Sequence, residues 1–153
     1  MTVSGQSDAV EGWRRIGAYV LCRDIDERVL LTRFRWPEHP DDGTWTAPGG
    51  SMEWGESPEA TARRELFEET GLSAELGPIL GIYSSWYTAE ESVLGTPGQH
   101  VGVVYRGHSL HGTLRVHFDD GTTDRADWFT LEEARALPLG RLGTFLLNLA
   151  EYA

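Results

Sequence analysis

The chain has 153 residues, enough for one domain with a buried core, and no apolar run approaches the length of a membrane span. Its formal net charge is −11, and all 13 basic residues are arginine, which argues against binding nucleic acid through a basic patch. The single cysteine, Cys22, excludes an internal disulfide and disfavours a zinc cluster. With no signal-peptide pattern at the polar N-terminus, a cytoplasmic protein with a small-molecule partner is expected, with no membrane and no nucleic-acid partner.

The first third of the chain alternates between apolar stretches and turn-forming residues. Residues 1–12 are predicted to be a flexible tail, and residues 13–153 a single domain. A turn is predicted at residues 24–28, and a loop at residues 36–44, which contain two prolines and a glycine. Strands are predicted at residues 15–22, 29–34 and 45–47.

The second half of the chain predicts a run of strands followed by two helices. Thr130 and Glu133 have the spacing of a capping box, so a short helix is expected to begin there and to end at Pro138. The residues Leu142, Phe145, Leu146 and Leu149 form an apolar stripe on a final helix. Strands are predicted at residues 73–87 (long or broken), 101–108, 113–118 and 126–129, with a loop at 89–98 and a hairpin turn at Ser109–Leu110.

The middle of the chain predicts a helix with a defined beginning and end. Pro48, Gly49 and Gly50 are typical of a turn. The helix is expected to begin with Ser57 as the N-cap and Pro58 as the first helical residue, and to stop at Gly71, where a left-handed conformation is favourable. Ala62, Leu66 and Thr70 are then expected to face the core, and the carboxylates to face outward.

Three carboxylates share one face of this predicted helix. Glu65, Glu68 and Glu69 stand at positions i, i+3 and i+4, where they repel one another unless a cation lies between them. A cluster of oxygen ligands suits Mg²⁺ or Mn²⁺ rather than zinc. Arg64 can reach Glu68 or Glu56 and keep that carboxylate ionised. A solvated acidic face is the alternative, since Glu-rich helices are common.

This segment resembles the Nudix box, G-x5-E-x7-R-E-U-x-E-E-x-G-U, in which U is an aliphatic residue. Residues 50–72 fill every specified position, with Gly50, Glu56, Arg64, Glu65, Leu66, Glu68, Glu69, Gly71 and Leu72. Periodicity alone supports an α+β fold. The resemblance implies a Nudix-type α/β/α sandwich, with a mixed β-sheet between the box helix and a C-terminal helix.

The resemblance also implies a reaction: hydrolysis of the diphosphate bond in a nucleoside diphosphate linked to another group. The substrate would be a nucleoside triphosphate or an ADP-ribose-like conjugate, and Mg²⁺ or Mn²⁺ would activate the attacking water. On this reading Glu65 and Glu69 are direct metal ligands, Glu68 is a ligand or lies near one, and the carbonyl of Gly49 contributes. Glu56 would act through water or by orienting the loop. The alternative is a Nudix-fold module that senses such a ligand without turnover.

The sequence leaves the identity of the general base and of the substrate contacts undecided. The base is either a box glutamate or an acid of the later loop, Glu90 or Glu91, and both loop acids are otherwise solvated. Histidines that could assist, or be merely structural, are His100, His108, His111 and His117. The aromatic side chains that could stack against a nucleobase are Trp36, Trp86 and Tyr87, with Trp45 and Trp54 as further candidates. Arg33 and Arg35 could hold a terminal phosphate. Exposed aromatics also serve dimer interfaces, so a homodimer stays open.

Overall fold

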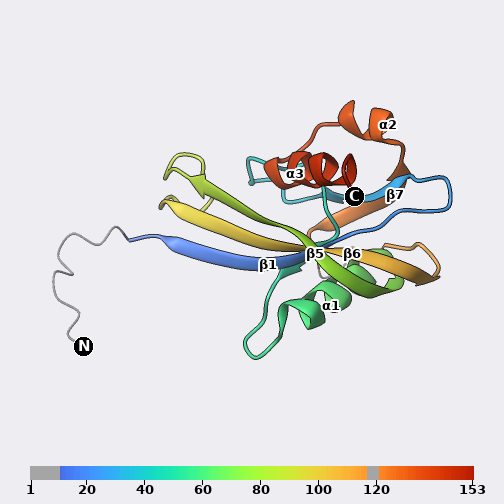
Figure 1. The fold of residues 1–153 in the computed structure, drawn as a ribbon. Coiled ribbons are helices and arrows are strands. Elements are labelled where there is room, and N and C mark those ends of the chain that lie inside the picture. The colour runs from blue at the N-terminus through green and yellow to red at the C-terminus, as the bar shows by residue number, and fades with distance from the viewer. Residues whose placement is uncertain (1–10, 117–120) are drawn as a thin grey trace.

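The computed structural model describes residues 11–116 and 121–153 (Figure 1). Most of the predicted tail, and His117, therefore lie outside the described residues. The elements in chain order are β1 (Trp13–Leu21), β2 (Val29–Phe34), β3 (Trp45–Thr46), β4 (Gly49–Ser51), α1 (Pro58–Thr70), β5 (Leu72–Tyr87), β6 (Gly98–Gly112), β7 (Thr123–Phe129), α2 (Leu131–Arg135) and α3 (Arg141–Ala150).

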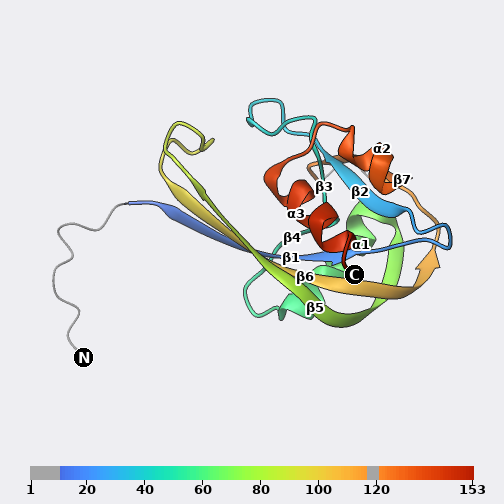
Figure 2. The same ribbon diagram turned by 45° about the horizontal axis from the view of Figure 1, so that its top comes forward.

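The strands form two sheets. One has four strands in the order β4-β1-β6-β5, and it is mixed because β1 runs parallel to β6 while the other pairs are antiparallel. The second has three antiparallel strands in the order β3-β2-β7. Helices α1 and α3 lie on opposite sides of the long strands (Figure 1), and α2 and α3 lie beside the second sheet (Figure 2). The α+β prediction, with a mixed sheet between two helices, is confirmed.

The core explains why β1 occupies the centre. Alternate side chains of a strand point to opposite faces, and both faces of β1 are covered over its second half. Ala18 and Val20 pack with Leu66 on the α1 side, whereas Tyr19 packs with Leu146 on the α3 side. A strand buried on both faces reads as a continuous apolar run, which is what residues 18–22 show.

The caps of α1 match the sequence. The hydroxyl of Ser57 accepts a hydrogen bond from the Ala60 N–H at 3.1 Å, and Pro58 opens the helix. Gly71 adopts a left-handed φ of 76° and donates to the carbonyl of Phe67. The capping box at Thr130 is also present. No helix in the described part of the chain is long and apolar enough to cross a membrane.

Two predictions for the segment between residues 109 and 118 were wrong. No hairpin turns at Ser109–Leu110: β6 continues through both residues and stays paired with β5 back to Leu72. Ser109 only distorts the strand locally, with φ at 52°. Of the predicted strand 113–118, residues 113–116 lie outside any strand and the remainder is beyond the described residues.

The predicted turn at Gly49–Gly50 is instead β4, because these residues pair with β1 opposite Ala18 and Tyr19. Gly49 tolerates this close approach only because it has no side chain. Its φ is 145°, and an added Cβ would lie 2.2 Å from the carbonyl oxygen of Ala18. The pairing brings the start of the box against the central strand.

Candidate active site

Arg64 organises the acids at the start of α1. Its Nε and one terminal nitrogen donate to the two carboxylate oxygens of Glu56, at 2.7 and 2.8 Å. The other terminal nitrogen donates to Glu65 at 3.0 Å and to Glu68 at 3.2 Å. Two parallel bonds from a guanidinium fix a carboxylate in both position and orientation. Bonds from Arg64 and from the Glu53 N–H hold the pKa of Glu56 at about 2.

Glu65 lies against the glycine that opens the box. A Cβ on Gly50 would come within 2.6 Å of the Glu65 carboxyl carbon, so the absence of a side chain at residue 50 makes room for this acid. The side chain of Glu65 is only 19% exposed, compared with 55% for Glu68. Burial raises the pKa of Glu65, and the charge of Arg64 opposes that rise.

Glu69 points inward rather than outward as predicted. One oxygen accepts from the backbone N–H of Gly49 at 2.7 Å, and the other accepts from the hydroxyl of Thr123. Burial raises its pKa to about 8, although both hydrogen bonds favour the ionised form. Among the described residues Glu69 has no ion-pair partner, so a cation brought close to it would stabilise its charge.

The carboxylates of the box suit a divalent metal ion, but their oxygens do not surround a common point in this structure. Among the described residues, no three His, Cys, Asp or Glu side chains stand close enough to hold a metal. Glu65 and Glu68 nevertheless converge on a single nitrogen of Arg64, which places one positive charge between two carboxylates. Carboxylate oxygens are ligands of Mg²⁺ and Mn²⁺. Glu65 and Glu68 are therefore candidate ligands of such an ion.

A cleft of about 420 Å³ opens beside the acids, within the range of small-molecule sites. Gly49, Glu69 and Thr123 line one end of it. Glu69 is thus the one box acid that lines the cleft, while Glu56, held by Arg64, does not line it.

Two groups of aromatic side chains line the same cleft. The Trp13 cluster consists of Trp13 and Tyr87, whose rings stack with centroids 5.7 Å apart, and the guanidinium of Arg141 lies 4.6 Å from the Tyr87 ring. The Trp36 cluster consists of Phe34, Trp36 and His39, with centroid distances between 4.9 and 6.4 Å. The first joins β1 to the end of β5, and the second belongs to the end of β2 and the loop before β3.

A buried polar pair, with one residue from β1 and one from β6, forms part of the cleft wall. The hydroxyl of Tyr19 and Nε2 of His100 are 2.8 Å apart. Burial lowers the pKa of His100 to about 4, so its imidazole is neutral at pH 7. The pKa of Tyr19 is raised to about 12, chiefly by burial. Both side chains are therefore uncharged at neutral pH, and they present a polar surface to the cleft.

The structure brings some of the predicted substrate contacts to the cleft and leaves others elsewhere. Trp36, Tyr87 and Glu91 line it. Arg33 is paired bidentately with Asp124, at 2.8 and 2.7 Å, and Arg35 lies 3.5 Å from Asp42. Neither arginine lines the cleft, and neither do Trp86 and Glu90.

The remaining aromatic candidates are accounted for by their surroundings. Trp45 is a core residue, 5% exposed and packed edge-on against Phe129. Trp54 is fully exposed in the loop before α1, away from the cleft.

Sequence reasoning missed several residues of the cleft, among them Trp13, Arg15 and Arg141. Trp13 and Arg15 share the face of β1 that carries Tyr19, and this period-two pattern was readable in the sequence. Arg141 is the first residue of α3, and a positive charge at a helix N-terminus is repelled by the helix dipole. An acidic partner for Arg141 was therefore to be expected. That partner is Glu91, and Arg141 also donates to the carbonyl of Trp86.

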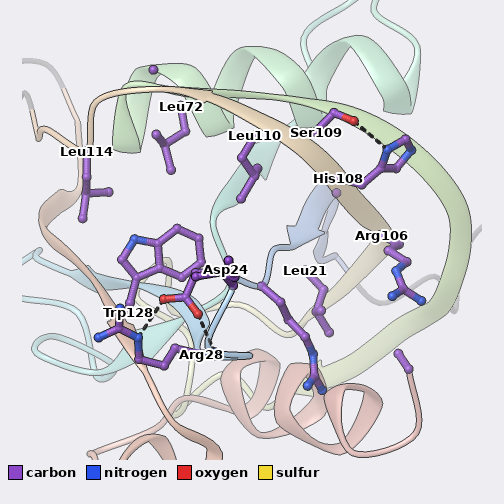
Figure 3. A pocket seen from close by; sticks show the side chains of 15 residues that line it. Leu21, Asp24, Arg28, Leu72, Arg106, His108, Ser109, Leu110, Leu114 and Trp128 are labelled. Atoms are coloured by element: carbon purple, nitrogen blue, oxygen red, sulfur yellow. Dashed lines mark hydrogen bonds and ion pairs between the residues drawn. The ribbon is translucent and has the colours of Figure 1, made fainter.

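A second pocket, of about 650 Å³, lies at the other end of the long strands (Figure 3). Leu72, Leu110 and Trp128 form part of its apolar wall, and Arg106 and His108 stand at its edge. No glutamate of the box lines it. The smaller cleft is the candidate active site because it alone of the two contains a box acid.

Comparison with known proteins identifies the family. The NUDIX domain family matches residues 13–145. A diphosphoinositol polyphosphate phosphohydrolase 3-alpha of Mus musculus is 36% identical over 75 residues, 48% of this chain and 43% of that protein. A MutT-like protein of Streptomyces ambofaciens is 44% identical over 60 residues, 39% of this chain and 36% of that protein. The matches thus span less than half the length of these relatives.

Solved structures agree on the fold. A MutT NUDIX hydrolase from Burkholderia pseudomallei superposes with a TM-score of 0.74 and 27% identity, covering 89% of this chain and 97% of that one. The NUDIX domain of Shewanella oneidensis NrtR, solved with ADP ribose, has a TM-score of 0.70 at 20% identity, covering 93% and 88%, and shows the fold alone.

The family model covers most of the chain, and the solved structures share its fold. The chain belongs to the NUDIX family, which generally uses a divalent metal ion.

Proposed function

We propose that this protein is an Mg²⁺- or Mn²⁺-dependent pyrophosphohydrolase that cleaves a nucleoside diphosphate linked to another group. The observation that carries the proposal is the continuous connection from Glu56 through Arg64 to Glu65, together with Glu69 at the end of the cleft. Each turnover would consume one water and one P–O–P linkage, and release two phosphorylated products. When bound, the divalent ion supplies charge neutralisation at the phosphate oxygens and lowers the pKa of water.

The box residues have distinct roles in this proposal. Glu65 and Glu69 would hold the metal, with Glu68 a ligand or near it, and the Gly49 carbonyl would contribute from the same end of the cleft. Arg64 would position Glu56 and Glu65 rather than touch substrate. Glu69 would remain ionised at neutral pH because a cation compensates its burial.

The general base is proposed to be a box glutamate rather than a loop acid. Glu91 lines the cleft, but its carboxylate is held by the Thr88 N–H and by Arg141, and both keep its pKa below its usual range. A carboxylate stabilised in this way is a weaker base. Glu90 does not line the cleft.

The test is an activity panel with Mg²⁺. Nucleoside triphosphates, ADP-ribose, NADH, dinucleoside polyphosphates and a diphosphoinositol polyphosphate would each be assayed for phosphate, pyrophosphate or monophosphate release. The expected result is turnover of at least one compound, abolished in Glu69→Gln and retained in the control Glu90→Gln. Tight binding of a panel compound with no turnover of any would favour the sensing module instead.

A further inference from the structure

The second pocket, which lies away from the box acids, has the features of a separate binding site. We propose that it binds a small organic anion, in which a carboxylate or a phosphate monoester is joined to an apolar ring or chain. Its volume of about 650 Å³ is within the range of small-molecule sites. Because no box glutamate lines this pocket, the proposal is independent of the reaction proposed above.

The charge of the pocket is opposite in sign to that of the protein. Acidic residues outnumber basic ones in the chain by 24 to 13, and the formal net charge is −11. The charged side chains that line the pocket are nevertheless three arginines, Arg23, Arg28 and Arg106, and one acid, Asp24. A local excess of positive charge on an acidic protein favours an anionic ligand at that place.

Asp24 and Arg28 neutralise each other within the turn between β1 and β2. Nε of Arg28 donates to Oδ2 of Asp24 at 2.7 Å (Figure 3). Oδ1 of Asp24 accepts from the backbone N–H groups of Asp26 and Arg28, at 3.0 and 2.8 Å. Both oxygens of Asp24 are therefore engaged by its own turn, and the other two arginines of the pocket keep their charge.

Arg23 and Arg106 carry the positive charge that remains. Neither forms an ion pair with the described residues. One terminal nitrogen of Arg23 donates to the carbonyl of Ala150, which is a neutral acceptor, and its Nε is buried with no acceptor in the described chain. Arg106 is exposed. Guanidinium groups without an anionic partner are donors that a carboxylate or a phosphate can accept from.

The strands bring these two arginines to one pocket. β1 ends at Leu21, which is paired with Arg106 of the parallel strand β6, and Arg23 follows two residues later. His108 shares a face of β6 with Arg106, because alternate residues of a strand point the same way (Figure 3). Nδ1 of His108 lies 3.5 Å from Glu75 of β5, so this ring already has a partner in the protein.

The rest of the pocket is mainly apolar. In the view of Figure 3, one group of apolar side chains lies on the opposite side from Arg106 and belongs to a single core cluster: Leu72, Leu110, Leu114 and Trp128. Ile25, which is 97% exposed, also borders the pocket. A ligand with a charged head and an apolar body would contact both sides, whereas an inorganic anion would leave the apolar wall in water.

The experiment titrates the whole chain in metal-free buffer at neutral pH and follows its amide signals by NMR. Naphthoate and naphthyl phosphate carry both a charge and a ring, naphthol carries the ring alone, and acetate and inorganic phosphate carry the charge alone. The two ring-bearing anions are expected to shift the signals of Arg23, Arg106 and Leu110. Naphthol, acetate and inorganic phosphate should each bind about 10-fold or more weakly, because each lacks one of the two kinds of contact.

Variants of Arg106 test the charge without disturbing the core, because this side chain is exposed. Arg106→Gln is expected to raise the Kd of naphthoate about 10-fold, the size of one charge-assisted hydrogen bond, and Arg106→Glu to raise it further. The amide spectra show at the same time that each variant is folded. Arg63→Gln, on α1, and Trp36→Ala, in the smaller cleft, are the controls, since neither residue lines this pocket.

Several results would overturn the proposal. These are naphthol or acetate binding as tightly as naphthoate, signal shifts confined to the smaller cleft, the same Kd in Arg106→Glu as in wild type, and no saturable binding of any probe. The tighter of the two ring-bearing anions identifies the head group, and either order supports the site. A failure of the pyrophosphohydrolase assay leaves this result unchanged, because the two pockets are lined by different residues.

Discussion

Arg64 and Glu56 form a two-bonded pair across the loop that leads into α1, with Nε 2.7 Å from Oε2 and Nη2 2.8 Å from Oε1. The pair is mostly enclosed, with the Arg64 side chain 24% and the Glu56 side chain 17% exposed. Glu56 also accepts from Glu53 and Thr61, so the carboxylate fixes both the loop and the helix start. The conformation of the acid site therefore depends on an arginine that does not line the cleft.

Arg64→Ala is expected to reduce kcat about 10- to 100-fold and to change KM little, because Arg64 orients acids rather than binding substrate. Steady-state kinetics on the best panel substrate checks this. Arg63→Ala is the control, since Arg63 is an exposed neighbour on the same helix outside the network. An unchanged kcat with a raised KM would show instead that Arg64 contacts substrate.

The burial of Glu69 makes stability depend on pH in the absence of metal. Its pKa rises from 4.5 to about 8 on folding, so the folded state binds more protons than the unfolded state between these values. Stability from this group is fully present below pH 4.5 and is lost as the pH rises towards 8, with a slope of at most about 1.4 kcal/mol per pH unit.

Glu69→Gln is expected to show no such loss of stability as the pH rises, because the amide stays neutral and its oxygen can still accept one hydrogen bond. Urea unfolding in EDTA at pH 5, 6, 7 and 8 gives the difference in the free energy of unfolding between wild type and Glu69→Gln. The variant should gain stability relative to wild type as the pH rises. A constant difference across these pH values would refute the raised pKa of Glu69 in the folded protein.

Gly50→Ala is expected to displace Glu65, because the new Cβ would lie 2.6 Å from its carboxyl carbon. Activity should fall by about 10- to 100-fold, as happens when supporting contacts of a metal ligand are lost, while the protein still folds. Activity assays and circular dichroism separate the two effects. Gly77→Ala is the control, since a Cβ there meets nothing closer than 3.5 Å. Wild-type activity in Gly50→Ala would mean that Glu65 is free to move.

Mg²⁺ is expected to stabilise the folded protein, by about 2.7 kcal/mol at a concentration 100 times its Kd. The double variant Glu65→Gln/Glu69→Gln should lose most of this gain because it lacks both proposed direct ligands. Thermal unfolding with and without Mg²⁺ measures it, with Glu90→Gln as the control outside the cleft. The same Mg²⁺-induced shift in the double variant and in wild type would place the metal elsewhere.

Local signals in the sequence predicted the local structure well. The strand Val29–Phe34, the Ser57 cap and the Gly71 stop all match, because each depends on residues adjacent in the chain. The errors fall where distant segments meet. Gly49 and Gly50 look like a turn until β1 is placed beside them, and Ser109–Leu110 looks like a hairpin until β5 provides a partner along the whole of β6.

The sequence by itself determined the box helix and its acids, since helical periodicity and capping act over a few residues. It also determined the family, and with it the proposed reaction. Only the tertiary structure decided that the partly buried Glu69 is hydrogen-bonded to Gly49 and Thr123, and that Trp13, Arg15 and Arg141 share a cleft with Trp36. Those contacts join residues from five different strands and helices and the loops between them, and packing brings them together in a way that spacing along the chain does not encode.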